Sequence, residues 1–132
     1  MNKHILLILL AVFTVSCQKE KITIDPDNLL LGTWQYSDYS GDMSVYTRNE
    51  SFDKDKPGYT FKPDGTLVER KNSGFCGTPP ITYADYDGTW VPESDSVILV
   101  NVGYWGGQMT YRLKIADINE HSLYVRHIYS EQ

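Results

Sequence analysis

The sequence predicts an all-β protein, folded as a small antiparallel up-and-down barrel of about seven or eight short strands. Residues 108–118, QMTYRLKIADI, show the clearest pattern, because apolar and polar side chains alternate along them. Strict alternation indicates a strand with one buried and one solvated face. Residues 58–72, GYTFKPDGTLVERKN, indicate a hairpin, since Asp64 and Gly65 suit the dihedral angles of a tight turn. No stretch of the chain shows sustained helical periodicity with end caps.

The remaining strands are expected between turns that are rich in glycine, proline, aspartate and serine. They are residues 31–39, 43–48, 82–91, 97–102 and 122–129. Two longer loops separate some of them. Residues 49–58, NESFDKDKPG, are strongly charged, and residues 73–80, SGFCGTPP, contain two adjacent prolines, which donate no backbone hydrogen bond.

Residues 1–16 predict a signal peptide that is removed. Lys3 gives a basic start, and residues 5–13, ILLILLAVF, form an apolar run. A membrane-spanning helix needs roughly 20 apolar residues, so this run is too short to persist as an anchor. The next residues, TVSC at 14–17, resemble the lipobox of bacterial lipoproteins, in which a small residue precedes a cysteine that receives lipid. Thr14 stands where that motif usually has leucine.

Lipidation of Cys17 would attach the protein to a membrane, because several acyl chains bind firmly where a single chain does not. Residues 17–28 would then form a flexible tether, and residues 29–132 the barrel domain. We expect a cell-envelope location at the outer membrane, since Gln18 is not the aspartate that favours inner-membrane retention in enteric bacteria. Both the periplasmic leaflet and the cell surface fit this expectation. The alternative is an ordinary secretory signal, with Cys17 as an unmodified thiol.

Charge and cysteine content exclude some classes of function. The chain has 12 basic and 17 acidic residues and a formal net charge of −5, so it lacks the basic surface that nucleic-acid binding requires. If Cys17 carries lipid, Cys76 has no partner for an intramolecular disulfide. The neighbours of Cys76 are apolar residues, glycine and proline. We therefore expect a small buried side chain there rather than a nucleophile.

Several motifs across residues 29–129 resemble the lipocalin-like lipoproteins of Bacteroidetes. They are LLGTW at 30–34, FKPDGT at 61–66, a second GTW at 88–90 and LYV at 123–125. The resemblance implies a small calycin-type barrel. It also implies a structural lid, in which Trp34 packs across the closed end of the barrel beneath Arg126. Simple alternation places Arg126 on the face opposite Leu123, so either a bulge intervenes or Arg126 is a surface residue. Trp90 has no counterpart in the motif and is expected in the core.

The sequence shows no recognisable catalytic motif, and we expect a binding protein rather than an enzyme, without a cofactor. Pairs of aspartates two residues apart occur, but none is completed as an EF-hand loop. His121 and His127 are too few for a zinc site without further ligands, so we expect no metal. One binding class is a small apolar or glycan ligand at one barrel mouth. The other is an envelope protein, bound by a module whose barrel is filled with its own side chains.

Two short segments are candidate sites. The tip GYWGG, residues 103–107, places Tyr104 and Trp105 between glycines, where they are expected to contact a ligand or partner. The alternative is that Trp105 folds back as a plug over the barrel end. Ser96 lies in the string DSV, which matches the O-glycosylation pattern of Bacteroidetes, at a predicted turn. The alternative for this serine is a role in the turn alone.

Overall fold

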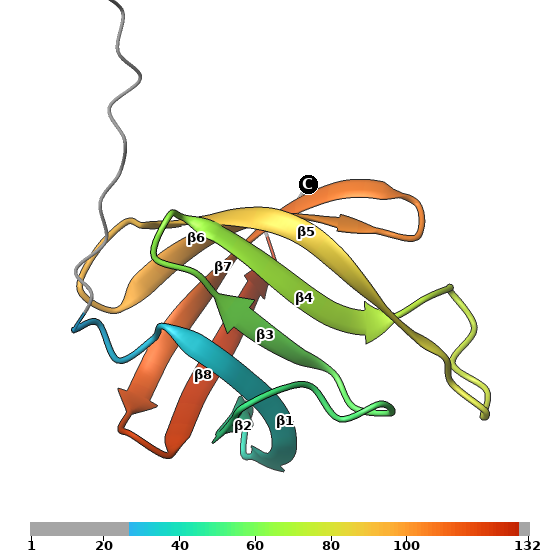
Figure 1. Ribbon diagram of the computed structural model, residues 1–132, viewed down its shortest axis with the longest axis horizontal. Helices are drawn as coiled ribbons and strands as arrows, with labels where there is room; N and C mark the ends of the chain where they lie inside the picture. Colours follow the sequence, from blue (N-terminus) through green and yellow to red (C-terminus); the bar gives the residue numbers. More distant parts are fainter. Residues whose placement is uncertain (1–26, 130–132) are drawn as a thin grey trace, which may run out of the picture.

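The computed structural model describes residues 27–129, and these residues form a closed barrel of eight antiparallel strands with no helix (Figure 1). The predicted fold class is therefore confirmed. In chain order the strands are β1 (Gly32–Ser40), β2 (Met43–Asn49), β3 (Gly58–Phe61), β4 (Thr66–Asn72), β5 (Tyr83–Pro92), β6 (Val97–Tyr104), β7 (Gly107–Ile118) and β8 (Ser122–Tyr129). The predicted signal peptide, Cys17 and nearly all of the predicted tether lie outside the described residues.

One connection departs from simple chain order. Around the barrel the strands follow the order β1-β2-β8-β7-β6-β5-β4-β3, so β1 lies between β2 and β3. The loop of residues 50–57 therefore crosses the outer face of β1. Gln35 holds this loop, because its Nε2 donates to Asp53 Oδ2 at 2.9 Å and its Oε1 accepts from the Asp53 backbone N at 2.8 Å. The loop leaves this outward-facing glutamine only 5% exposed.

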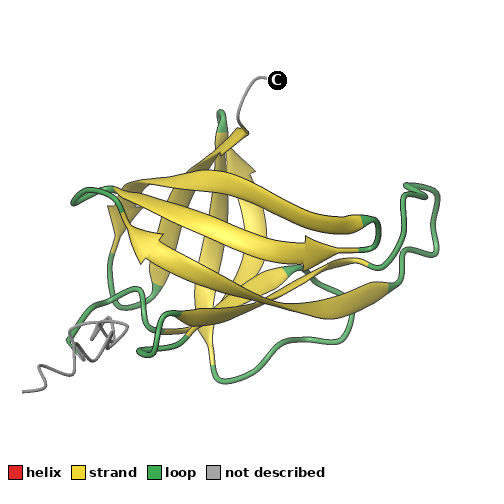
Figure 2. Ribbon diagram, turned by 90° about the horizontal axis from the view of Figure 1, so that it is seen from above, coloured by secondary structure: helices red, strands yellow, loops and turns green. Residues whose placement is uncertain are grey.

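The two ends of the barrel differ (Figures 1 and 2). At the end that we call the closed end lie the start of β1 and the turns β3–β4, β5–β6 and β7–β8. At the other end, the open end, lie the β1–β2 turn, residues 73–82, the β6–β7 turn and the end of β8. Strand pairing is incomplete there, since β5 pairs with β6 only from Gly88 onward and β8 pairs with β2 only up to Val125. The hairpins β4–β5 and β6–β7 therefore diverge at the open end.

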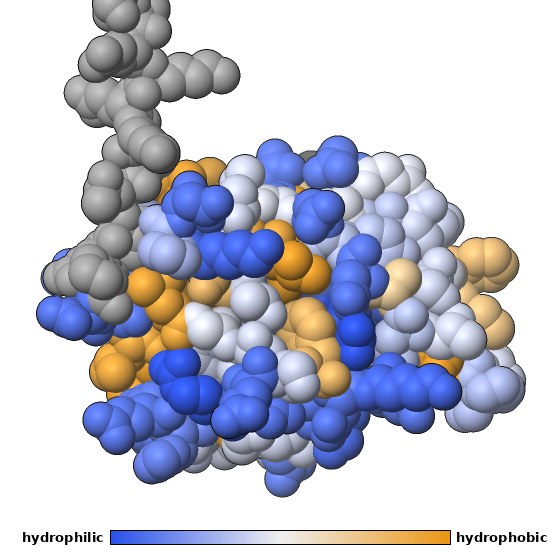
Figure 3. Space-filling view, in the orientation of Figure 1, coloured by the Kyte–Doolittle hydropathy of each residue, from blue (hydrophilic) through white to orange (hydrophobic). Residues whose placement is uncertain are grey.

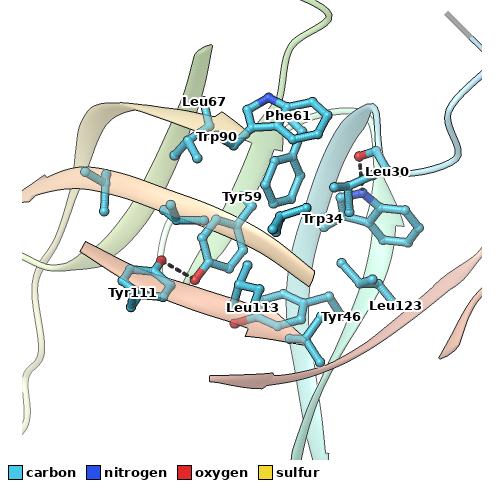
Figure 4. Close-up of a cluster of buried hydrophobic side chains, with 14 residues drawn as sticks. Leu30, Trp34, Tyr46, Tyr59, Phe61, Leu67, Trp90, Tyr111, Leu113 and Leu123 are labelled. Carbon is cyan, nitrogen blue, oxygen red and sulfur yellow. Dashed lines mark hydrogen bonds between the residues drawn. The ribbon is translucent and has the colours of Figure 1, made fainter. Parts of the chain in front are cut away.

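The barrel interior is filled by its own side chains (Figure 4). The buried apolar and aromatic residues are Leu30, Trp34, Tyr46, Tyr59, Phe61, Leu67, Trp90, Ile98, Val100, Val102, Tyr111, Leu113, Leu123 and Val125. Trp90 is 1% exposed, as expected for a core anchor, and its Nε1 donates to the carbonyls of Lys62 and Thr66, both at 3.1 Å. Its edge packs against Phe61, with ring centroids 5.5 Å apart. These contacts fix the β3–β4 turn over the core.

Each Gly-Thr-Trp triplet requires glycine at its first position, because of a positive φ in the first triplet and a close backbone contact in the second. Gly32 has a φ of +114°, and a Cβ there would lie 2.7 Å from Arg48 Nη1. A Cβ on Gly88 would lie 2.3 Å from the carbonyl oxygen of Asn101, on the neighbouring strand. In chain order, Gly88 is also the first residue of β5 that pairs with β6. The second triplet thus marks the point where the two hairpins separate.

The cation over Trp34 is Arg48, which corrects the expected pairing of Trp34 with Arg126. The Arg48 guanidinium carbon lies 4.2 Å from the Trp34 ring centroid, and Trp34 Nε1 donates to the Leu30 carbonyl at 2.8 Å. Arg126 instead forms a salt bridge with Asp42 at 2.7 Å, at the open end. Alternation along β8 turns Arg126 outward, and the register shift between β7 and β8 does not reverse it, because it lies in β7 between Ile115 and Asp117. The structural role of Trp34 remains, with a different partner.

Arg48 also joins the closed end through backbone contacts. Its Nε donates to the Glu120 carbonyl at 2.8 Å, and its Nη1 donates to the Leu31 carbonyl at 2.7 Å. Its Nη2 donates to the carbonyl of Leu29. One side chain thus links β2, the segment before β1 and the β7–β8 turn.

Replacing Arg48 by alanine is expected to lower the free energy of unfolding by about 2 kcal/mol, because the cation-π contact and three charge-assisted hydrogen bonds are lost. Arg126→Ala is the matched control, since its single ion pair with exposed Asp42 is solvated. Urea denaturation of both variants measures the difference. Equal losses in the two variants would contradict the assignment of Arg48 as the lid.

Candidate functional site

Three aromatic side chains gather outside the barrel at its open end, and we call them the aromatic rim: Phe75, Tyr104 and Trp105. Phe75 is 83% exposed and Trp105 is 54% exposed. The ring centroids of Phe75 and Trp105 lie 5.7 Å apart, and those of Tyr104 and Trp105 lie 5.6 Å apart. Trp105 is therefore not a plug over the barrel, and of the two readings of the GYWGG tip the exposed one agrees with the structure.

The local sequence explains this presentation. Strands β6 and β7 extend further than predicted and leave only Trp105 and Gly106 as the turn between them. The ring of Tyr104 folds over Gly106, where a Cβ would lie 2.7 Å from Tyr104 Cε2. Gly107 has a φ of +143°, which side-chain-bearing residues rarely adopt. The flanking glycines thus allow a tight turn that leaves Trp105 in solvent.

Inside the open end lies a polar cluster: Tyr59, Glu69, Lys71, Tyr111 and His127. The Tyr59 hydroxyl lies 2.6 Å from the Tyr111 hydroxyl and 3.1 Å from His127 Nε2 (Figure 4 shows the tyrosine pair). Lys71 Nζ and Glu69 Oε2 form an ion pair at 2.9 Å, with side chains only 19% and 12% exposed. These residues come from β3, β4, β7 and β8, so barrel closure brings them together.

The electrostatics of the cluster keep its phenols and imidazole neutral at ordinary pH. Burial raises the pKa of Tyr111 and of Tyr59, and the nearby Glu69 carboxylate raises both further. Burial also lowers the pKa of His127. The interior therefore offers hydroxyl and imidazole groups as hydrogen-bonding partners, with the Glu69–Lys71 pair as its partly buried charges.

Lys71 connects the polar cluster with the hairpin that carries the rim. Its Nζ lies 3.6 Å from Met109 Sδ and 5.4 Å from the centroid of the Tyr86 ring. Met109 belongs to β7 and lies two residues from its start at Gly107. The open end thus carries exposed aromatic side chains outside the barrel and partly buried polar groups inside it. This combination suits a ligand that has both apolar faces and hydroxyl groups.

The other residues singled out from the sequence lie elsewhere. Cys76 is exposed, so the expectation of a buried side chain was wrong: the loop of residues 73–82 projects from the open end and leaves its thiol in solvent. Ser96 lies in the β5–β6 turn, where its carbonyl accepts from the Ile115 backbone N at 2.6 Å. Among the described residues, no group of three or more histidine, cysteine, aspartate or glutamate side chains could hold a metal.

Sequence reasoning missed the polar cluster, although a signal was present. Glu69 and Lys71 have the same parity as Leu67 along β4, and Leu67 is 1% exposed. Their side chains must therefore face the barrel interior, where charged residues are rare unless they are paired. The sequence did not show that Tyr59, Tyr111 and His127 would meet them.

Comparison with protein-family models, with curated proteins and with solved structures finds no match to this chain. The case for the open end as a site therefore rests on its own geometry. Over residues 27–129, no helix is long and apolar enough to cross a membrane.

The stability of the protein is expected to fall as the pH drops below about 6.5, because the lowered pKa of His127 means that the unfolded chain binds a proton before the folded one. The loss continues down to the folded pKa of His127. Urea denaturation between about pH 7.5 and 5.5 measures the free energy of unfolding. This window lies above the pH range in which carboxylates titrate, so their protonation does not contribute. His127→Gln should flatten this dependence, whereas His121→Gln, in the exposed β7–β8 turn, should preserve it. An unchanged slope in the His127 variant would contradict the account.

Proposed function

We propose that this protein is an outer-membrane lipoprotein, anchored through Cys17, whose barrel binds a small glycan at its open end. The lipobox-like string and the resemblance to lipocalin-like lipoproteins of Bacteroidetes support the first part of the proposal. The aromatic rim supports the second part. The observation that carries it is the exposure of Phe75 and Trp105, two large aromatic side chains in contact with each other and largely in water.

A glycan fits this end better than a purely apolar ligand. Core side chains such as Tyr59 and Tyr111 fill the barrel beneath this end, so a long apolar chain would find little space there. Sugars have apolar faces that pack on aromatic rings and hydroxyl groups that pair with polar side chains. The rim supplies the rings, and the Glu69–Lys71 pair lies on the inner face of the same end.

The test measures the affinity of Trp105→Ala for sugars. Wild-type protein is screened on an array of bacterial and host oligosaccharides, and the best binder is titrated by calorimetry. Removing the indole should weaken binding about tenfold, since a stacked aromatic contact with its buried area contributes about 1 to 2 kcal/mol. Tyr39→Ala is the matched control, because Tyr39 is 62% exposed, also lies at the open end and is not part of the rim. Wild-type affinity in Trp105→Ala would contradict the proposed site.

A second candidate function is protein interaction, and the filled interior together with the exposure of Phe75 favours it. In this case the aromatic rim would contact an envelope protein and no sugar would bind. A photo-crosslinking residue in place of Trp105, used in living cells, separates the two functions. A single discrete protein adduct at position 105, absent from a probe placed at position 39, would favour the protein partner.

The lipid anchor has its own test. Growth of a Bacteroidetes host with a fatty-acid analogue should label the wild-type protein, and Cys17→Ala should abolish the label. Label that persists in the variant would remove the anchor from the proposal. Intact mass of the same material also tests whether Ser96 carries a glycan, because an unmodified lipoprotein mass would leave that serine as a turn residue.

A further inference from the structure

A pocket lies at the closed end, remote from the aromatic rim. Its volume is about 320 Å³, near the lower limit of small-molecule sites, which run from roughly 300 to 1,000 Å³. Its floor consists of Leu30, Trp90 and Ile98, each at most 3% exposed. Leu29 forms part of its wall and is 44% exposed. Figure 3 shows hydrophobic surface at this end of the molecule, on the left of the view.

The pocket has an apolar floor and an acidic residue at its opening. Ile115 and Ile118 complete the apolar wall on the side of β7. Asp95, in the β5–β6 turn, is exposed and forms no ion pair with any residue that the structure describes. The nearby Glu93 is already paired with Arg112 at 2.7 Å. No lysine or arginine among the described residues lines the pocket, so Asp95 gives its opening a negative charge.

We propose that this pocket binds a single-chain amphiphile with a cationic head. The alkyl chain lies against Leu30, Ile98 and Ile118, where it is removed from water. The ammonium group lies beside Asp95, which provides an opposite charge, whereas a carboxylate head would be repelled there. The site is separate from the sugar site proposed at the open end, because the two lie at opposite ends of the barrel.

The three tryptophans make the proposal directly testable, since each reports on a different place. Trp90 lines the pocket, Trp34 lies beneath Arg48, and Trp105 lies on the aromatic rim. The full chain with Cys17→Ser, which cannot carry lipid there, is labelled with ¹⁵N-tryptophan. Its indole N–H signals are assigned and followed by NMR during titration with dodecylamine or laurate below their micellar concentrations.

Dodecylamine should shift the Trp90 signal saturably and leave the Trp105 signal in place. Laurate should bind roughly 4- to 25-fold more weakly, because one exposed charge pair is lost and a repulsion of similar size replaces it. Asp95→Asn should weaken dodecylamine binding about two- to fivefold, the effect of one exposed charge pair. Leu29→Ser should weaken it about fivefold through lost apolar contact. Ile128→Ser is the matched control, because Ile128 is 43% exposed and lies on β8 outside the pocket, and it should bind as the wild type does.

The proposal is overturned if neither amphiphile moves the Trp90 signal up to its solubility limit. It is also overturned if laurate binds as tightly as dodecylamine, or if Leu29→Ser behaves like Ile128→Ser. A shift of the Trp105 signal alone would place amphiphile binding at the open end and would likewise contradict it. None of these outcomes depends on sugar binding, so this proposal and the proposed function fail separately.

Discussion

Replacing Trp90 by alanine is expected to lower the free energy of unfolding by about 3 to 5 kcal/mol, the usual effect of truncating a buried tryptophan. Trp90 is 1% exposed, packs edge-on against Phe61, and holds the β3–β4 turn through its indole N–H, which two carbonyl oxygens share in bifurcated hydrogen bonds. The alanine variant leaves a cavity and frees the Lys62 and Thr66 carbonyls from these bonds. Urea denaturation measures the change.

Trp105→Ala is the internal comparison, because it removes the same side chain from an exposed turn. Its unfolding free energy should stay within about 0.5 kcal/mol of the wild type. Comparing the two variants therefore distinguishes a tryptophan that packs in the core, Trp90, from one that is available to contact a ligand, Trp105. A loss in Trp105→Ala that approached the loss in Trp90→Ala would show that Trp105 packs as a plug, and the glycan site would have to lie elsewhere.

Gly88→Ala is expected to destabilise the barrel by about 2 to 3 kcal/mol, at the upper end of overpacking effects. The new methyl group would lie 2.3 Å from the Asn101 carbonyl oxygen and 2.8 Å from Val102 Cβ, and the first of these is backbone that cannot rotate away. Strands β5 and β6 would have to move apart at Gly88, where they are paired in the wild-type protein. Thermal or urea denaturation measures the loss.

Gly77→Ala is the control for this prediction. Gly77 lies in the loop between β4 and β5, and a Cβ there meets nothing within 4 Å. The free energy of unfolding of the Gly77→Ala variant should differ from that of the wild type by no more than about 0.5 kcal/mol. If the Gly88 and Gly77 variants were equally stable, close strand approach would not explain the glycine of the second Gly-Thr-Trp triplet.

The strands were predictable because short-range alternation determines which side chains face the core. β8 has the predicted bounds of Ser122–Tyr129, and β7 starts one residue earlier than residues 108–118 suggested. Alternation also placed Arg126 outward, against the lid that the family resemblance implied. The pattern within the strand was the better guide in this case, since the resemblance carries no information on which arginine reaches Trp34.

Contacts between distant segments were not predictable. The position of β1 between β2 and β3 depends on how residues 50–57 cross it, and Gln35 shows no sign of that role in a strand pattern. Arg48 reaches Leu31 and Glu120 only because the closed barrel brings these segments together. Cys76 lies in a loop, where apolar neighbours in sequence do not imply burial.

The candidate site was predictable only in part. The glycines around Trp105 were compatible with an exposed tip and with a plug over the barrel end, and the structure decides for the exposed tip. The alternation of side chains along β4 could have placed Glu69 and Lys71 inside the barrel, since they lie on the same face of the strand as Leu67. The contact of Tyr59 with Tyr111 and His127 depends on barrel closure, which a single sequence does not report.

Native mass spectrometry of the protein purified from its own host tests the central claim, binding of a small ligand at the open end. Wild-type protein should retain a small molecule of sugar mass after removal of detergent. Trp105→Ala should lose it, whereas Tyr39→Ala should keep it. A bare protein mass for the wild type, or an equally occupied Trp105→Ala variant, would contradict the account.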